Sequence, residues 1–421
     1  MSRSDALLSR AQKVIPGGVN SPVRAFKAVG GKPPFIAKGQ GVTLWDEDDA
    51  AYLDCVCSWG AMPLGHANPA VVKAIEESAA LGTSFGAPTA REVMLAEAIC
   101  DRVPSVEQVR LCSSGTEATM HAVRLARGAT GRDLIVKMDG CYHGAHDALL
   151  VGAGSGVATF AIPGSPGIPA SVAAQTLVIP FNDLAAAEEV FAAHGEKIAG
   201  VILEPIAGNM GCIPPVEGYL EGLRALTSKH GSLLIFDEVM CGFRVARGSA
   251  QERYGVIPDL TTMGKIVGGG LPLAAFGGRA DVMDHLAPKG PVYQAGTLSG
   301  NPLAVAAALA TLDQLTPEVY DRWEEIGRTV EEEFLIPATK QGLSYHRVGS
   351  MWTLFFKDEA PHNFASVQRC DMGRFAKFFQ SALNHGIYLP ASQYEAIFLS
   401  ALMTKEDTEQ LVSGLRKSLR S

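Results

Sequence analysis

Two charged side chains, Asp237 and Lys265, stand where they could act on one bound molecule. Asp237 ends an apolar run, Leu-Leu-Ile-Phe at 233–236, and Lys265 follows Thr-Met-Gly and precedes a glycine triplet at 268–270. A carboxylate at the end of a buried strand can keep a ring nitrogen protonated, and a lysine can hold an aldehyde as a Schiff base. The pair therefore favours pyridoxal phosphate as cofactor and amine chemistry as function.

Each member of this pair also has an ordinary interpretation. Asp237 and Glu238 could cap the following helix or bind magnesium, as the acid of a Walker-B strand does. The sequence around Lys265 does not match the motif of a phosphate-binding loop at two positions. Ile266 stands where the motif requires Ser or Thr, and Asp259 stands where it requires glycine. The apolar neighbours of Lys265 favour a lowered pKa of its amine, which makes it nucleophilic.

A hydroxyl-rich turn, Ser-Ser-Gly-Thr-Glu at 113–117, is the candidate phosphate site. It follows a predicted strand, 109–112, and opens a predicted helix, 116–127. The N–H groups and dipole at such a helix start favour an anion. The same residue types also cap ordinary helices, so both interpretations stay open. A second turn, 296–302, also precedes a helix and could donate to the same phosphate.

Tyr142 and His143 follow a predicted strand and supply a candidate ring contact. An aromatic side chain there can stack on a planar cofactor, or it can simply pack at a domain seam. His143, His146 and Asp147 resemble a metal cluster only superficially, because Gly144 disfavours a regular helix that would align them.

Composition narrows the class of protein. The 421 residues are 47% hydrophobic, and a net charge of −8 without a basic stripe disfavours nucleic-acid binding. The eight cysteines are dispersed, so free thiols are expected, and Cys55 and Cys57 alone disfavour a zinc site. The start of the chain lacks an apolar leader and no stretch suits a membrane span, so we expect a soluble, cytoplasmic protein.

The hydrophobic pattern predicts an α/β fold. From about residue 61 to 315, short apolar strands alternate with helices, which is typical of a largely parallel sheet covered by helices on both faces. Residues 316–421 mix charged helices with strands and predict a smaller α+β domain, completed by the N-terminal segment 1–60. The expected strands of the large domain are 109–112, 134–137, 176–179, 201–203, 233–236 and 274–277.

The stretch 152–169 is rich in Gly, Ala, Ser and Pro and has few large apolar side chains. It lacks the last glycine of a dinucleotide fingerprint, since residue 157 is Val. It could be a long surface connection, but a compact domain rarely keeps such a loop without a use. We therefore favour a lid.

With these features together, the chain resembles the class III aminotransferase group of fold-type I pyridoxal-phosphate enzymes. The resemblance runs nearly end to end, through segments 16–26, 84–89, 204–210, 237–240 and 292–302. It implies a large cofactor-binding domain (61–315), a small C-terminal domain (316–421), and a homodimer that acts on a small molecule. Segment 152–169 corresponds to the mobile gate of the group.

The resemblance also implies roles for single positions. Lys265 would hold the cofactor and move protons, and Asp237 would pair with the pyridine nitrogen. Other cofactor contacts would come from Ser114, Gly115, Thr116, Tyr142, His143, Asn209 and Val239, and from Thr297 across the dimer interface. Arg24 would bind the substrate carboxylate, and the remaining implied substrate contacts are Ser21, Trp59, Ser155 and Glu395.

Within the group, segments 20–24 and 84–89 favour an aminomutase. The implied reaction converts glutamate 1-semialdehyde to 5-aminolevulinate, a tetrapyrrole precursor, with the cofactor alternating between pyridoxal and pyridoxamine phosphate. The alternative is an ω-aminotransferase, which uses a separate amino donor and acceptor. A non-catalytic protein would require loss of Lys265 or Asp237. The chain departs from the expected pattern at Ala145-His146, Cys241 and Ile397.

Overall fold

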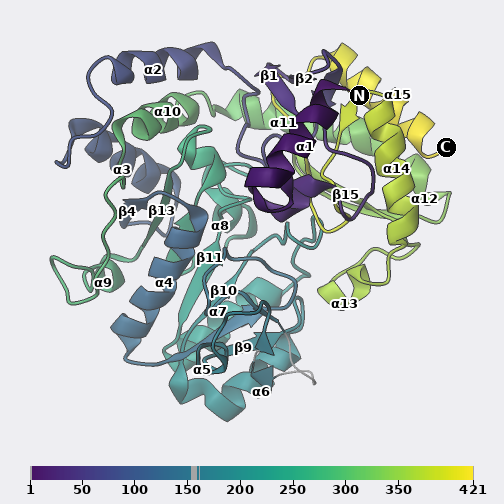
Figure 1. Cartoon of the computed structure of the whole chain (residues 1–421). Helices are drawn as coiled ribbons and strands as arrows, with labels where there is room; N and C mark the ends of the chain where they lie inside the picture. The colour runs from purple at the N-terminus through teal and green to yellow at the C-terminus, as the bar shows by residue number, and fades with distance from the viewer. Residues whose placement is uncertain (1, 153–158, 161, 421) are drawn as a thin grey trace.

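The computed structural model describes residues 2–152, 159–160 and 162–420, in which helices and strands alternate along most of the chain (Figure 1). No helix in these ranges is long and apolar enough to cross a membrane. The α-helices are α1 (Arg3–Val14), α2 (Pro69–Ala79), α3 (Ala90–Arg102), α4 (Gly115–Thr130), α5 (Ala170–Ala173), α6 (Leu184–His194), α7 (Tyr219–His230), α8 (Ser249–Tyr254), α9 (Ala280–Met283), α10 (Pro302–Leu312), α11 (Pro317–Val330), α12 (Ile336–Thr339), α13 (Phe364–Val367), α14 (Met372–Asn384) and α15 (Lys405–Ser418).

An eight-stranded sheet forms the centre of the large lobe, in the order β4-β13-β12-β11-β10-β5-β9-β7. The five strands from β12 to β9 run parallel, whereas β13 is antiparallel to both neighbours and β7 is antiparallel to β9. The predicted α/β class with a mainly parallel sheet is confirmed. The strands are β4 (Gln108–Cys112), β5 (Leu134–Met138), β7 (Thr159–Phe160), β9 (Thr176–Ile179), β10 (Ile198–Leu203), β11 (Leu233–Asp237), β12 (Leu260–Met263) and β13 (Ala274–Gly278).

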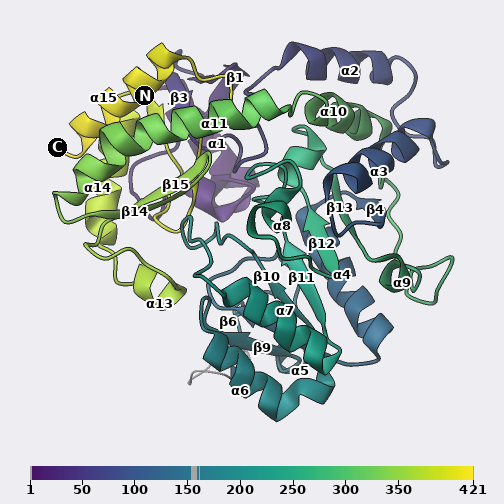
Figure 2. The ribbon, with the colours of Figure 1, turned by 180° about the vertical axis from the view of Figure 1, so that it is seen from behind.

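Helices cover both faces of this sheet, as Figures 1 and 2 show from opposite sides. Successive side chains of a strand point to opposite faces. In β11, Leu233 and Ile235 pack in the cluster that contains α4, while Leu234 and Phe236 pack in the cluster that contains α6 and α7. Because both faces are buried, β11 is a continuous apolar run rather than an alternating one.

Strand β12 was not among the predicted strands, although it carries Lys265 at its end. Its sequence, Leu-Thr-Thr-Met, looks half polar, yet all four residues are buried. Thr261 hydrogen-bonds Ser105 at 2.8 Å, and Thr262 donates to Asp237 at 3.1 Å. These partners lie far away in the sequence, so the pattern of residues could not predict that the hydroxyls are satisfied inside the core.

The smaller lobe combines both ends of the chain. A four-stranded sheet joins β1 (Ile36–Gln40), β2 (Thr43–Asp46) and β3 (Ala51–Asp54) to β16 (Ile387–Tyr388). A second, three-stranded sheet joins β14 (Ser344–Val348), β15 (Met351–Phe355) and β17 (Ile397–Phe398). Both termini lie at this lobe (Figure 1). The exact limits 1–60, 61–315 and 316–421 remain predictions.

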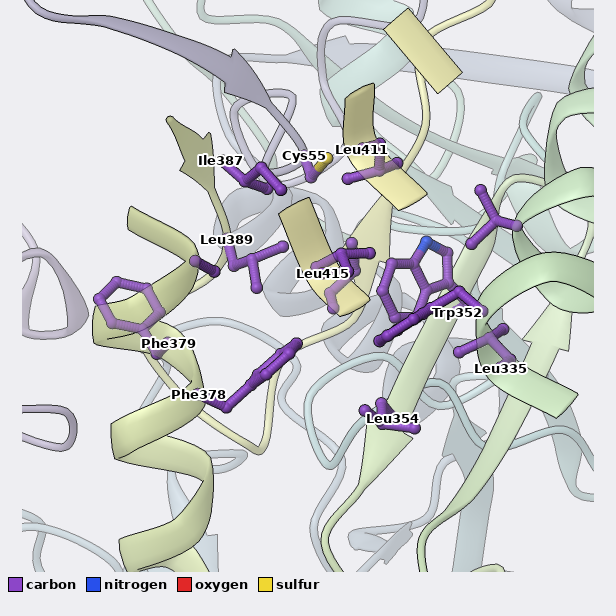
Figure 3. Close-up of a cluster of buried hydrophobic side chains, with 14 of the residues drawn as sticks. Cys55, Leu335, Trp352, Leu354, Phe378, Phe379, Ile387, Leu389, Leu411 and Leu415 are labelled. Carbon is purple, nitrogen blue, oxygen red and sulfur yellow. The ribbon is translucent and has the colours of Figure 1, made fainter. Parts of the chain in front are cut away.

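One hydrophobic core holds the two chain ends together in the smaller lobe. Figure 3 shows Cys55, from the segment after β3, among side chains of the C-terminal region. Trp352 of β15, Phe379 of α14 and Leu411 of α15 belong to the same cluster and are fully buried. Packing of this core therefore fixes where the N-terminal segment lies.

Truncating one member of this core is expected to destabilise the protein markedly. Leu411→Ala removes buried methyl groups from a closely packed cluster, and such changes lower the free energy of unfolding by about 2–5 kcal/mol. Urea denaturation measures the loss. Leu402→Ala, at a leucine that is 44% exposed, is the control and is expected to cost less than about 1 kcal/mol.

The stretch 152–169 is only partly described. Strand β6 (Val151–Gly152) pairs with β8 (Ile162–Pro163), and β7 pairs with β9 at the sheet edge. Within the stretch, β7 is thus the edge strand of the eight-stranded sheet. Residues 153–158, including Ser155, lie outside the described residues, so the lid and the substrate contact of Ser155 stay predictions.

Candidate active site

The predicted cofactor residues meet where the parallel strands end. The carboxyl ends of parallel strands share one edge of a sheet, which is where open α/β sheets bind ligands. A cavity of about 240 Å³ lies there and is lined by all the predicted cofactor residues of the chain except Thr297. The predicted residues are Ser114, Gly115, Thr116, Tyr142, His143, Asn209, Val239, Asp237 and Lys265; Thr119, Gly144, Glu204 and Met240 complete the lining.

Asp237, the last residue of β11, is fixed by three hydrogen bonds. Its Oδ1 accepts from the Oγ1 of Thr262 and from the backbone N–H of Val239, both at 3.1 Å. Its Oδ2 lies 2.7 Å from Nδ1 of His143. A carboxylate held in this way has a defined direction and can form a charge-assisted hydrogen bond to a protonated ring nitrogen.

His143 lies behind this carboxylate and was predicted as a direct cofactor contact. It is almost completely buried, and Nδ1 donates to Asp237 because an ionised carboxylate only accepts. The backbone carbonyl of His143 accepts a hydrogen bond from the Oγ1 of Thr119 at 2.6 Å. Nε2 is buried without a hydrogen-bond partner among the described residues. The structure thus makes His143 a support of Asp237 as well as part of the cavity wall.

Lys265 follows β12 with a left-handed backbone, φ +49°. A side chain on Gly264, just before it, would be tight, because a Cβ there would lie 3.1 Å from the side chain of Val239. Burial lowers the pKa of the Lys265 amine. The carboxylates of Asp237, Glu204 and Glu395 oppose that shift. A lysine with a lowered pKa keeps a larger neutral fraction, the form that attacks a carbonyl or accepts a proton.

The turn before α4 forms a close-fitting cradle. Ser114 caps the helix by accepting from the N–H of Glu117 at 3.2 Å, and the Glu117 carboxylate folds back to accept from the N–H of Ser113 at 2.8 Å. A Cβ on Gly115 would lie 3.0 Å from Val239. The first N–H groups of a helix lack partners within the helix, so this turn offers donors to an anion at the cavity wall.

A second glycine, Gly144, brings the neighbouring loop against this turn. Its φ is +88°, and a Cβ there would come within 2.5 Å of the Oγ1 of Thr116. Thr116 also accepts from the N–H of Ala145 at 3.2 Å. The cavity therefore offers phosphate donors, a fixed carboxylate and a nucleophilic amine together, and this donor set fits pyridoxal phosphate.

Glu204, at the end of β10, is a site residue that the sequence analysis missed. It is buried and accepts from the N–H groups of Tyr142 and Gly208, at 3.1 and 2.9 Å, and from Nδ2 of Asn209 at 3.0 Å. Burial raises its pKa. Its position directly after an apolar strand could have identified it from the sequence, because the same feature identified Asp237. Glu204 fixes two walls of the cavity relative to each other.

None of the predicted substrate residues that the structure describes lines this cavity. Arg24 and Trp59 line a second, larger cavity of about 390 Å³ beside the N-terminal segment, with the guanidinium of Arg24 5.2 Å from the Trp59 ring centre. Ser21 lies next to Arg24, directly before the 3-10 helix Pro22–Ala25. Thr297 is exposed and lines neither cavity.

Glu395 lines neither cavity, but the charge of Lys265 acts on its carboxyl group. Burial raises the pKa of Glu395 to about 7, and Lys265 opposes that shift. Its Oε2 is buried without a hydrogen-bond partner among the described residues. A carboxyl group with this pKa can give or take a proton near neutral pH.

The magnesium interpretation of Asp237-Glu238 finds no support. Glu238 points away from the cavity and accepts from the N–H of Ala250 at 2.6 Å and from Nε2 of Gln251 at 2.9 Å. Within the described part of the chain, no group of three or more His, Cys, Asp or Glu could hold a metal ion.

The positions that depart from the family pattern lie outside the cavity lining. Cys241 is buried and contacts the Glu238 carboxylate through its Sγ at 3.6 Å. Ile397 is buried in β17, opposite Trp352 of β15. Neither residue lines the cavity, so neither replaces a cavity group.

Comparison with known proteins identifies relatives over the whole chain. The aminotransferase class-III family matches residues 26–419. The glutamate-1-semialdehyde 2,1-aminomutase of Sorangium cellulosum is 58% identical, over 99% of this chain and 96% of that protein. The protein of the same name from Myxococcus xanthus is 53% identical, over 100% of this chain and 98% of that protein.

Solved structures agree on the fold. An omega-transaminase from Sphaerobacter thermophilus superposes with a TM-score of 0.93 at 32% identity, over 100% of this chain and 97% of that one. A glutamate-1-semialdehyde-aminomutase from Pseudomonas aeruginosa superposes with a TM-score of 0.88 at 26% identity, over 99% of this chain and 94% of that one. A variant of that protein is solved in complex with PMP.

Proposed function

The chain belongs to the class-III aminotransferase family, and from that premise we propose that it is a glutamate-1-semialdehyde 2,1-aminomutase dependent on pyridoxal phosphate. It would move an amine within one molecule and produce 5-aminolevulinate for tetrapyrrole synthesis. The observation that carries the proposal is the meeting of Lys265 and Asp237 in one cavity. The identity of 52–58% to relatives of that name favours the mutase over other family members.

The roles at the cofactor end of the site follow the family resemblance, and the lining of one cavity by all of these residues supports them. Gly115 and Thr116 would hold the phosphate, Tyr142 and Val239 would cover the ring, and Asn209 would approach its phenolic oxygen. When bound, the cofactor supplies a carbonyl or amine that exchanges with the substrate and a ring that withdraws electrons. Asp237 would hold a proton on the ring nitrogen, which favours that withdrawal.

Lys265 would act as the acid–base of the reaction. Its lowered pKa leaves a neutral fraction that can take a proton from one carbon of the substrate and return it nearby. Glu395 would exchange protons with the substrate amines. The planar guanidinium of Arg24 would match the substrate carboxylate, and Ser21, Trp59 and Ser155 would be further substrate contacts.

We also propose a homodimer that completes the phosphate site. Thr297 is exposed and lies between the exposed side chains of Tyr293 and Leu298, which are 72% and 53% exposed. Exposed apolar side chains around a predicted cofactor contact suit a second copy of the chain. A cytoplasmic location is proposed as well, supported by the eight free cysteines.

An assay of purified enzyme tests the function. Glutamate 1-semialdehyde is supplied without any added amino donor or acceptor, and 5-aminolevulinate is measured. An aminomutase completes many turnovers under these conditions. An ω-aminotransferase, the candidate favoured by the TM-score of 0.93, stops unless a second amine or carbonyl compound is added. Dependence on such a compound would replace the mutase proposal.

The pH dependence of turnover is expected to depend on Glu395. Only the ionised carboxyl can accept a proton from a substrate ammonium group, and its pKa is about 7. We therefore expect kcat/KM to rise as pH increases through 7 and then level off. Glu395→Gln should abolish this rise and lower kcat/KM at pH 8 by roughly 10²-fold. Exposed Glu196→Gln is the control; an unchanged pH profile in Glu395→Gln would contradict the assignment.

A further inference from the structure

A short left-handed turn presents Trp59 at the edge of the second cavity. Cys57, Ser58, Trp59 and Gly60 have φ values of +46°, +51°, +54° and +86°. The N–H of Gly60 donates to the carbonyl of Val56 at 3.1 Å, so these residues form one turn of left-handed helix. Residues with a Cβ adopt this conformation singly and rarely in sequence. The surrounding structure must therefore hold this turn in place.

Besides the hydrogen bond from the N–H of Met62 to the carbonyl of Cys57 at 2.9 Å, a side chain restrains the turn at each end. At its start, Oδ1 of Asp54 accepts from the N–H groups of Val56 and Cys57, at 2.8 and 3.1 Å. At its end, the guanidinium of Arg244 donates to the carbonyl of Gly60 at 2.6 Å. The first restraint is local, whereas the second comes from another part of the chain.

Arg244 is unusual because its charge is buried without an acid. It is 1% exposed, and no carboxylate of the described residues forms an ion pair with it. Its guanidinium lies between the rings of Trp323 and Phe398, at 5.1 and 5.0 Å, and also donates to Oγ of Ser350 at 3.0 Å. Burying an unpaired charge is unfavourable for stability. This placement points to a role other than stability alone.

The turn connects Arg244 to the predicted substrate contact. Trp59 supports the exposed guanidinium of Arg24, whose charge lies 5.2 Å from the Trp59 ring centre. Arg244 itself lies on the connection between β11 and α8, and this connection begins directly after Asp237. The carboxylate of the cofactor site and the support of the substrate site therefore share one short segment.

We propose that Arg244 is a positioning residue for substrate recognition, which holds the 57–60 turn so that Trp59 places Arg24 at the substrate carboxylate. The inference rests on the proposed function for the identity of that substrate. Arg244 lines neither the cofactor cavity nor the cavity of Arg24 and Trp59, so we expect it to act on the binding of the carboxylate and to leave the chemistry at Lys265 intact.

Arg244→Lys tests this role in the holoenzyme. Lysine keeps the charge but loses the planar fork that contacts several oxygens. We expect KM for glutamate 1-semialdehyde to rise about tenfold, with kcat changed less than about threefold and the cofactor absorption spectrum unchanged. Levulinate, a carboxylate without an amine, should bind the pyridoxal-phosphate form about tenfold more weakly by calorimetry. The matched control is Arg247→Lys, at an exposed arginine on the same segment.

A double-mutant cycle separates positioning from general damage. If Arg244 acts through Trp59, adding Arg244→Lys to Trp59→Ala should raise KM by less than about twofold. An equal rise in both backgrounds overturns the inference, as does a loss of kcat or cofactor binding with KM unchanged. Arg244-dependent levulinate binding in a protein that fails the mutase assay would overturn the proposed function and leave the positioning role standing.

A second pair of variants tests the turn without touching the core. Ser58 is exposed, so both Ser58→Val and Ser58→Gly should fold even if Arg244→Lys does not. Valine is disfavoured at positive φ and glycine is not. We expect the KM of Ser58→Val to exceed that of Ser58→Gly by about fivefold, with the levulinate affinity following the same order. Equal values would overturn the inference.

Discussion

Replacing Lys265 by alanine is expected to lower kcat by roughly 10³- to 10⁴-fold, because proton transfer by a positioned group contributes about that much. Among the described residues, Lys265 is the only lysine that lines the cavity, and its loss removes a cation on which the charges of Asp237, Glu204 and Glu395 act. Covalent attachment of the cofactor should disappear as well. Steady-state kinetics measures the first effect, and mass spectrometry after borohydride reduction of the holoenzyme measures the second.

The control is Lys197→Ala, at an exposed lysine remote from the cavity lining. It should keep kcat and the cofactor mass on its active-site peptide. A Lys265→Ala enzyme that retains more than about one tenth of the parent kcat would contradict the assignment. So would a cofactor found on another lysine of the parent enzyme after reduction.

The site residues that could be predicted from the sequence are those at or directly after the ends of strands. Asp237 stands after an apolar run that is buried on both faces, and the turn at Ser114 follows another strand. Strand ends can be recognised from local sequence, and a parallel sheet brings them to one edge. The same rule would have selected Glu204, which also closes an apolar run.

What could not be predicted depends on contacts between distant residues. His143 supports Asp237 across 94 positions of sequence, and no local pattern assigns it that partner. Strand β12 escaped recognition because the hydroxyls of Thr261 and Thr262 find partners only in the folded core. The placement of Arg24 beside Trp59 depends on packing between the chain ends. Long-range hydrogen bonds and domain packing are thus the missing information.

Asp237→Asn is expected to give the second-largest loss, roughly 10²- to 10³-fold in kcat, as for removal of an electrostatic stabiliser of the transition state. The volume is unchanged, and the amide oxygen can still accept from Thr262 at the 3.1 Å position of Oδ1. The amide nitrogen, however, would face Nδ1 of His143, where the carboxylate now accepts at 2.7 Å. The asparagine would also carry no negative charge near a ring nitrogen, so the protonated ring would lose its stabilising partner.

Kinetics and equilibrium dialysis of the cofactor measure the two consequences of Asp237→Asn, and exposed Asp321→Asn serves as the isosteric control. Thermal unfolding separates them from a folding defect. His143→Leu leaves the carboxylate charged but removes its hydrogen-bond donor, so it should cost less than Asp237→Asn if charge at the ring nitrogen is the main effect. Should His143→Leu be the more damaging variant at equal stability, the orientation of the carboxylate, and not its charge, would limit the reaction.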